Sequence, residues 1–84
     1  MVPVGLAFER SRRENPPIDL YYLDGKHPNL EGTYLAACVF YAAFYSKSPE
    51  GNAYVAGLNV DIARKLQKTA WDTVKAFYGK APDG

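Results

Sequence analysis

The sequence predicts a mainly α-helical fold with two long helices, one shorter helix and at most one short strand. Residues 60–78 repeat apolar side chains at intervals of three and four, which is typical of an amphipathic helix. Tyr34 to Tyr45 is a twelve-residue run without charge, preceded by helix-start signals. The chain has 84 residues, of which 48% are hydrophobic, so it has ample material for the core of one small domain or of part of a larger one.

The shorter helix is expected from Leu6 to about Asn15. Its far end is cationic, which suits a helix C-terminus, and Pro16-Pro17 ends it. Val2-Pro3-Val4 before it has the composition of a strand end. Nothing aromatic or glycine-rich accompanies the basic side chains, so they are predicted to be solvated charges and not a phosphate site. They are Arg10, Arg12 and Arg13.

A strand-like segment and a turn follow. Ile18 to Tyr22 is rich in apolar residues, and Asp24-Gly25 is a turn dipeptide. Asn29 is predicted to cap a helix from Leu30 to about Ser46. Gly32, near the start of that helix, is expected to allow close packing against the preceding loop.

The second long helix is predicted to start after Asn59 and to end at Gly79, with residues 79–84 as a frayed tail. Between the long helices, residues 46–58 contain Pro and Gly and are predicted to form a loop. The predicted apolar stripe of this helix consists of Ile62, Ala63, Leu66, Ala70, Val74, Phe77 and Tyr78, widened by Trp71.

The helix from Leu30 carries apolar or aromatic side chains on every side, so it needs cover on every side. Two other helices and short connections hardly provide that cover. The sequence therefore predicts either association with another chain or a place in a larger fold.

Composition also limits the classes of partner. The net charge of +1 gives no electrostatic reason to expect nucleic acid or an anionic membrane. The apolar run is shorter than the roughly 18–20 residues that a bilayer requires. Met1 to Gly5 lacks the basic start of a signal peptide, and no compartment is predicted. Cys38, the single cysteine, is expected to be a buried apolar residue because nothing nearby would lower its pKa.

Asp24 and His27 are the candidate catalytic residues. A carboxylate that bonds one imidazole nitrogen fixes the tautomer, and the other nitrogen can then take a proton from a nucleophile. Their spacing within a turn allows the two side chains to converge. His27 is the only histidine, so a metal site would be short of ligands, and neither a metal nor a cofactor is predicted.

The segment Asp24 to Ala37 (Asp-Gly-Lys-His-Pro-Asn-Leu-Glu-Gly-Thr-Tyr-Leu-Ala-Ala) resembles the C-terminal part of SGNH hydrolases, also called GDSL-type esterases. The similarity spans roughly Val2 to Tyr78, with Leu66-Gln67 followed by Ala70-Trp71 and with Ser-Pro-x-Gly in the loop. Val2 to Phe8 also resembles the stretch that precedes this block in some bacterial members.

The resemblance implies that Asp24 orients the imidazole and that His27 is the general base of a Ser-Asp-His triad. It also implies that residues 1–84 form a single partial domain, the C-terminal segment of a three-layer α/β/α sandwich. The implied substrates are small esters or acyl-carbohydrates. The Gly-Asp-Ser-like block and the oxyanion-hole glycine and asparagine of the family do not occur in this sequence. Ser11, Ser46 and Ser48 are expected to be solvated and not nucleophilic.

Three interpretations therefore remain open. The chain is a hydrolase segment that is inactive alone and lacks an N-terminal hydrolase part, or a small helical protein that self-associates through its apolar helix. The third is one half of a two-chain enzyme whose partner supplies the serine.

Overall fold

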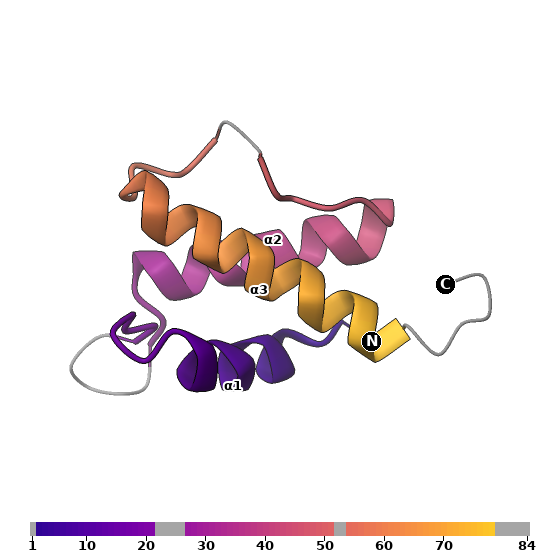
Figure 1. Cartoon of the computed structure of the whole chain (residues 1–84), viewed down its shortest axis with the longest axis horizontal. Coiled ribbons are helices and arrows are strands. Elements are labelled where there is room, and N and C mark those ends of the chain that lie inside the picture. Colours follow the sequence, from indigo (N-terminus) through magenta and orange to yellow (C-terminus); the bar gives the residue numbers. More distant parts are fainter. Residues whose placement is uncertain (1, 22–26, 52–53, 79–84) are drawn as a thin grey trace.

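The computed structural model of the chain describes residues 2–21, 27–51 and 54–78. Within these ranges it contains three helices: α1 (Val4–Glu14), α2 (Leu30–Tyr45) and α3 (Val60–Tyr78) (Figure 1). The predicted mainly α-helical fold, with two long helices and a shorter one, is thereby confirmed. The predicted end of the last helix at Gly79 and the frayed tail 79–84 lie outside the described residues.

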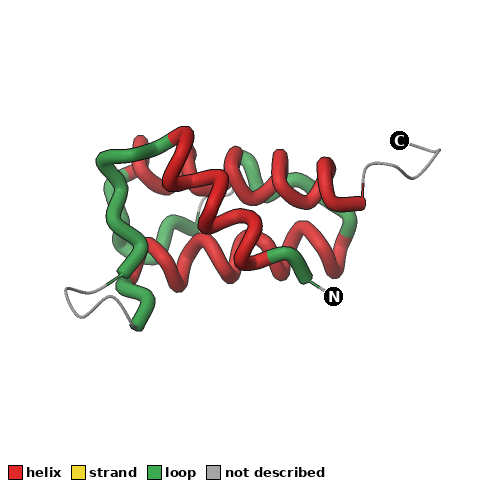
Figure 2. The backbone as a smooth tube through the Cα atoms, turned by 90° about the horizontal axis from the view of Figure 1, so that it is seen from below, coloured by secondary structure: helices red, strands yellow, loops and turns green. Residues whose placement is uncertain are grey.

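Each of the three helices contacts the other two. Helices α2 and α3 run in the same general direction, whereas α1 runs in the opposite direction (Figures 1 and 2). Because α2 and α3 point the same way, the connection 46–59 must return along the length of α2 before α3 begins. A helix of 16 residues is about 24 Å long, which explains why this connection is long for a helical protein.

Helix α1 begins at Val4, two residues earlier than predicted, and the predicted strand end at residues 2–4 is wrong. Pro3 occupies the N-cap position with φ −83°, and its carbonyl oxygen accepts a hydrogen bond from Ala7 N at 3.1 Å. Proline is tolerated at this position because no intrahelical hydrogen bond uses the N–H that it lacks. The helix ends at Glu14, before Pro16-Pro17 as expected.

Helix α2 starts at the predicted residue, has the predicted N-cap and ends within one residue of the predicted end. Asn29 Oδ1 accepts a hydrogen bond from Gly32 N at 2.8 Å, and Glu31 lies in the first turn. Ser46 ends the helix in the left-handed conformation with φ 54°. Asn59 caps α3 in the same way, with Oδ1 accepting from Asp61 N at 2.8 Å.

The segment 18–21 forms no strand. Among the described residues, its sheet-like pairing consists of one isolated antiparallel bridge between Tyr21 and Pro28. Ile18 and Leu20 instead turn toward the helices, with Leu20 in the core and Ile18 packed against it.

The core lies where the three helices meet. The predicted stripe on α3 is correct in its middle and wrong at its end, because Phe77 and Tyr78 are exposed in the last turn. The buried hydrophobic residues are Ala7, Leu20, Tyr34, Leu35, Cys38, Val39, Ala42, Ala63, Leu66, Ala70 and Val74.

Several polar side chains are also buried, and one of them contradicts a prediction. Ser11 is fully enclosed, not solvated. It lies one turn beyond Ala7 on the face of α1 that meets the other helices, where a small side chain is required. Asn15 Nδ2 bridges this face to α3 by donating to Thr69 Oγ1 at 2.9 Å. The others are Gln67, Thr69 and Thr73.

Candidate functional site

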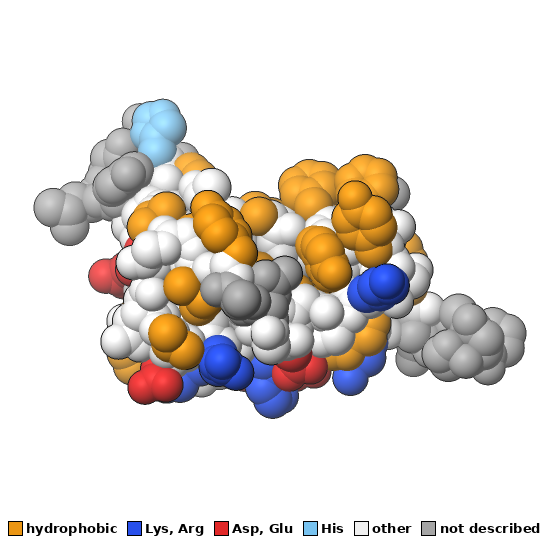
Figure 3. Space-filling model, turned by 90° about the horizontal axis from the view of Figure 1, so that it is seen from above, with side chains coloured by type: hydrophobic (Ala, Val, Ile, Leu, Met, Phe, Trp, Pro, Cys, Tyr) orange, Lys and Arg blue, Asp and Glu red, His pale blue; other side chains and the backbone are white. Residues whose placement is uncertain are grey.

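The candidate histidine lies three residues before the start of α2. The isolated bridge between Tyr21 and Pro28 places residues 18–21 beside the segment that contains His27. His27, one residue before Pro28, is exposed, and its imidazole stands at the edge of the molecule in Figure 3. Asp24 lies outside the described residues, so the predicted pairing of its carboxylate with the imidazole stays a prediction.

Asn29 joins the start of α2 to residues 19–21. While its Oδ1 caps α2, its Nδ2 donates to the carbonyl oxygens of Asp19 at 2.9 Å and Tyr21 at 3.4 Å. Its backbone N–H donates to Leu20 O at 3.0 Å. One side chain therefore ties the start of α2 to residues 19–21, and His27 is two residues from Asn29.

Gly32 allows the two segments to approach. A Cβ at position 32 would overlap the carbonyl oxygen of Leu20 and would come within 3.0 Å of the Cβ of Pro28. Only glycine leaves room for the chain to cross the first turn of α2 at this distance. The predicted reason for a small residue at this position is confirmed.

The serines of the chain have other roles. The hydroxyl of Ser11 lies in the interface with α3, 3.4 Å from Asn15 Nδ2. Ser48 Oγ accepts from Glu50 N at 3.0 Å and donates to Glu50 Oε1 at 3.1 Å, which stabilises the turn after α2. The hydroxyls of Ser11 and Ser48 therefore have structural roles. The imidazole of His27 is exposed and could transfer a proton.

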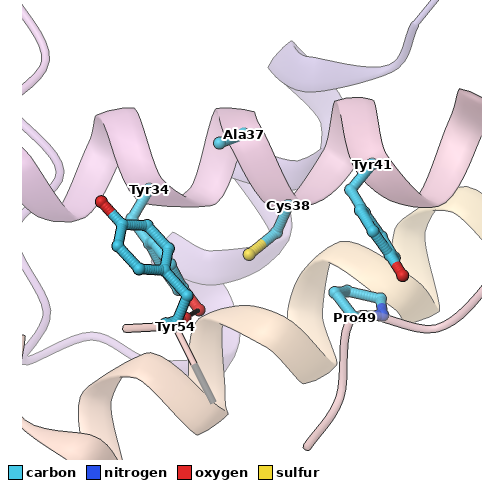
Figure 4. Close-up of a pocket in the computed structure, with 6 residues that line it drawn as sticks. All are labelled: Tyr34, Ala37, Cys38, Tyr41, Pro49 and Tyr54. Atoms are coloured by element: carbon cyan, nitrogen blue, oxygen red, sulfur yellow. Dashed lines mark hydrogen bonds between the residues drawn. The ribbon is translucent and has the colours of Figure 1, made fainter. Parts of the chain in front are cut away.

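A second feature is a cavity of about 150 Å³ beside α2. The thiol of Cys38 and the ring of Tyr41 point toward it, and Pro49 lies below them (Figure 4). It is lined by Tyr34, Ala37, Cys38, Tyr41, Pro49 and Tyr54.

A buried chain of hydrogen bonds borders this cavity. Gln67 Nε2 donates to the Tyr34 hydroxyl at 2.9 Å, and that hydroxyl donates to Tyr54 O at 2.8 Å. Gln67 Oε1 accepts from Gly51 N at 3.0 Å. Sequence periodicity missed Gln67, because a polar residue beside the apolar stripe of a helix is usually solvated. No signal in the sequence distinguishes it from its exposed neighbours.

The chemistry of Cys38 follows from its burial. Burial raises the pKa of the Cys38 thiol to about 11, although its hydrogen bond with Tyr34 acts in the opposite direction. A thiol with this pKa is almost entirely protonated at neutral pH, and only the thiolate is a good nucleophile. The prediction that Cys38 is a buried, unreactive apolar residue agrees with this environment.

The third feature is a group of exposed aromatic side chains on the outer side of α2. Phe40, Phe44 and Tyr45 have 45%, 74% and 65% of their surface exposed. Hydrophobic side chains gather at one end of the face shown in Figure 3. The rings form pairs along the helix, Phe40 with Phe44 at 6.2 Å and Tyr41 with Tyr45 at 5.2 Å between centroids. The core covers only one side of the helix that was predicted to need cover on every side.

Neither a metal centre nor a membrane span is found in the part of the chain that the structure describes. Its His, Cys, Asp and Glu side chains form no group of three or more able to hold a metal ion. Its helices are too short or too polar to cross a bilayer. Comparisons of the chain with protein-family models, curated proteins and solved structures give no match.

Proposed function

We propose that this chain is the C-terminal segment of an SGNH-type serine hydrolase and supplies the acid and the base of its triad. The observation that carries the proposal is the exposed position of His27 just before α2. The start of α2 is held close to residues 19–21 by the hydrogen bonds of Asn29 and by the space that Gly32 leaves. An imidazole that must reach a serine on another segment needs both exposure and a fixed attachment. The Asp-x-x-His block supplies the family assignment.

In the proposed enzyme, His27 takes the proton of a serine outside this sequence as the hydroxyl attacks the ester carbonyl. The imidazolium then gives this proton to the leaving alcohol. Asp24 holds the ring in the required tautomer and stabilises the imidazolium. The substrate is a small ester or an acyl-carbohydrate, as the resemblance implies.

The exposed aromatic side of α2 is consistent with this proposal. In the three-layer sandwich of the family, the helix after the histidine loop packs into the body of the domain. Phe40 and Phe44 would then be covered by that body. The 84 residues alone are expected to have no esterase activity, because the nucleophile is absent.

The test begins with the coding sequence upstream of this chain, read in all frames for a Gly-Asp-Ser-like block. The product that includes this block is then assayed with p-nitrophenyl acetate and with a fluorophosphonate probe for an activated serine. We expect turnover that falls by about 10³-fold or more in Asp24→Ala and His27→Ala. Glu50→Ala, a change at an exposed acid outside the Asp-x-x-His block, is the matched control and should retain activity.

Two results would contradict the proposal. One is an upstream sequence without a serine block, and the other is activity that survives His27→Ala. Folding of the 84-residue chain should be insensitive to His27→Ala, within about 0.5 kcal/mol, because the ring is exposed. A loss of activity in that variant would then report on chemistry and not on unfolding.

A further inference from the structure

The cavity beside α2 lies between two tyrosine side chains of that helix, Tyr34 and Tyr41 (Figure 4). Two small residues between them, Ala37 and Cys38, also line it. Helix positions that differ by three, four and seven residues lie on one side of the helix. The order of large, small, small and large side chains therefore leaves a hollow in the middle of this side, and the connection 46–59 forms its other wall.

Hydrogen bonds hold this other wall in place. Tyr54 O accepts from the Tyr34 hydroxyl at 2.8 Å, and Gly51 N donates to Gln67 Oε1 at 3.0 Å. Pro49 is buried, and its ring restricts the backbone. The connection is therefore fixed at a distance from α2 and does not close the hollow. A cavity whose walls are already in place needs little reorganisation when a ligand binds.

The lining of the cavity is uncharged. The six described residues that line it include no Asp, Glu, Lys, Arg or His. The Cys38 thiol is neutral at pH 7, because burial raises its pKa to about 11. The Tyr34 hydroxyl already donates to Tyr54 O and accepts from Gln67 Nε2. A water molecule in a cavity needs roughly two to four polar partners, so this lining favours an apolar occupant over water.

From these features we propose that the cavity binds one neutral, apolar molecule of about the size of a benzene ring. Its volume is about 150 Å³, and dry apolar cavities of about this volume bind benzene. The aromatic side chains in the lining offer ring surfaces for contact with such a ligand. Ala37 and Tyr54 are exposed, and a ligand would enter between them. The inference does not depend on the proposed hydrolase function, because the lining contains neither of the proposed catalytic residues.

The test is an NMR titration of the 84-residue chain with toluene as the probe. We expect saturable shift changes with a dissociation constant of about 0.1–1 mM, since a ligand of this size has little apolar surface to bury. Nuclear Overhauser contacts should join toluene to the rings of Tyr34 and Tyr41. The midpoint of thermal unfolding should rise with the toluene concentration, because a ligand that binds only the folded state stabilises it.

Charged molecules with the same ring are the control ligands. Benzoate and benzylammonium should each bind at least tenfold more weakly than toluene, because an unpaired charge is costly in an apolar site. Benzoate or benzylammonium binding as tightly as toluene would overturn the proposal of a neutral ligand.

Two substitutions fill the cavity from α2. Cys38→Leu extends the side chain in the direction in which the thiol points, and Ala37→Leu adds bulk at the exposed edge. Each should weaken toluene binding at least tenfold, with the helicity measured by circular dichroism unchanged. Ala76→Leu makes the same change at an exposed position of α3 outside the lining, and it should leave toluene binding unchanged. If Cys38→Leu does not fold, Ala37→Leu decides, because its site is exposed.

Three further results would overturn the proposal. The first is the absence of saturable shift changes up to the solubility limit of toluene. The second is a set of Overhauser contacts confined to Phe40 and Phe44, which lie outside the cavity lining. The third is toluene binding by Ala37→Leu that is as tight as binding by the natural chain.

Discussion

The side chains of Tyr34 and Gln67 are joined inside the protein by a hydrogen bond of 2.9 Å, in which Gln67 Nε2 donates to the Tyr34 hydroxyl. This pair links α2 to α3. It also holds both described parts of the connection 46–59, through Gly51 N on Gln67 and Tyr54 O on Tyr34. The parallel arrangement of α2 and α3 requires this long connection, and the buried pair fixes it against the helices.

Tyr34→Phe should lower the free energy of unfolding by about 1–3 kcal/mol. The change removes the acceptor of the Gln67 Nε2 bond and the donor of the Tyr54 O bond, and the loss of hydrogen bonds made by a buried hydroxyl is costly. Chemical denaturation followed by circular dichroism measures the loss. Tyr45→Phe removes the same hydroxyl from a side chain that is 65% exposed and should change stability by less than about 0.5 kcal/mol. Equal effects of the two changes would contradict the role assigned to the pair.

The sequence predicted the helices better than it predicted the interfaces between them. Periodicity and capping residues are local signals, and they placed α2 and the start of α3 correctly. Ser11 and Gln67 are buried for a different reason, because they face other helices and their neighbours there are distant in the sequence. Phe77 continues the stripe of α3, but it is exposed because the helix extends beyond the core. Local patterns contain no information on where a partner helix ends.

Gly32→Ala should destabilise the protein by more than 1 kcal/mol, approximately the magnitude seen when bulk is forced into a packed site. The new Cβ would overlap Leu20 O, and the backbone at Leu20 would have to move away from α2. Gly5→Ala is the matched control, because Gly5 also lies in a first helical turn and has no atom within 4 Å of its added Cβ. That change should stabilise the protein by a few tenths to about 1 kcal/mol. Thermal unfolding of both variants should therefore show shifts of opposite sign.

Asn29→Asp separates the two functions of Asn29. An aspartate can still cap α2 through Gly32 N, but it cannot donate to Asp19 O and Tyr21 O. We expect a loss of about 1–2 kcal/mol in the free energy of unfolding, because a carboxylate would then face these carbonyl oxygens. Asn59→Asp is the matched control, since Asn59 caps α3 through Oδ1. It should be nearly neutral, and a similar loss at both positions would show that only capping matters.

The candidate site was predictable to a limited extent. Asn29 and Gly32 were identified from local rules for helix starts, and the exposed position of His27 agrees with its expected place in a turn. The donation from Asn29 Nδ2 to the preceding segment was not predicted, because the sequence does not show that residues 18–21 return alongside the start of α2. In the proposed enzyme the imidazole would act on a serine outside these 84 residues, and no pattern within them specifies that serine.

The buried thiol of Cys38 should make stability depend on pH in the alkaline range. Its pKa is about 11 in the folded protein against 9.0 for an ordinary thiol, so the unfolded chain loses the proton first. The free energy of unfolding therefore does not depend on this thiol's ionisation below pH 9.0, and it falls by about 2 kcal/mol as pH rises toward about 11.

The measurement is the difference in unfolding free energy between the natural chain and Cys38→Ala at several pH values. Burial raises the pKa of Tyr34 as well, and this part of the shift is present in both proteins. The part that comes from the neighbouring Cys38 is lost in Cys38→Ala and adds to the difference in the same direction. The difference should be constant up to about pH 8.5 and should then shift in favour of Cys38→Ala. A difference that stays constant up to pH 11 would show that the thiol ionises as easily in the folded protein as in the unfolded chain.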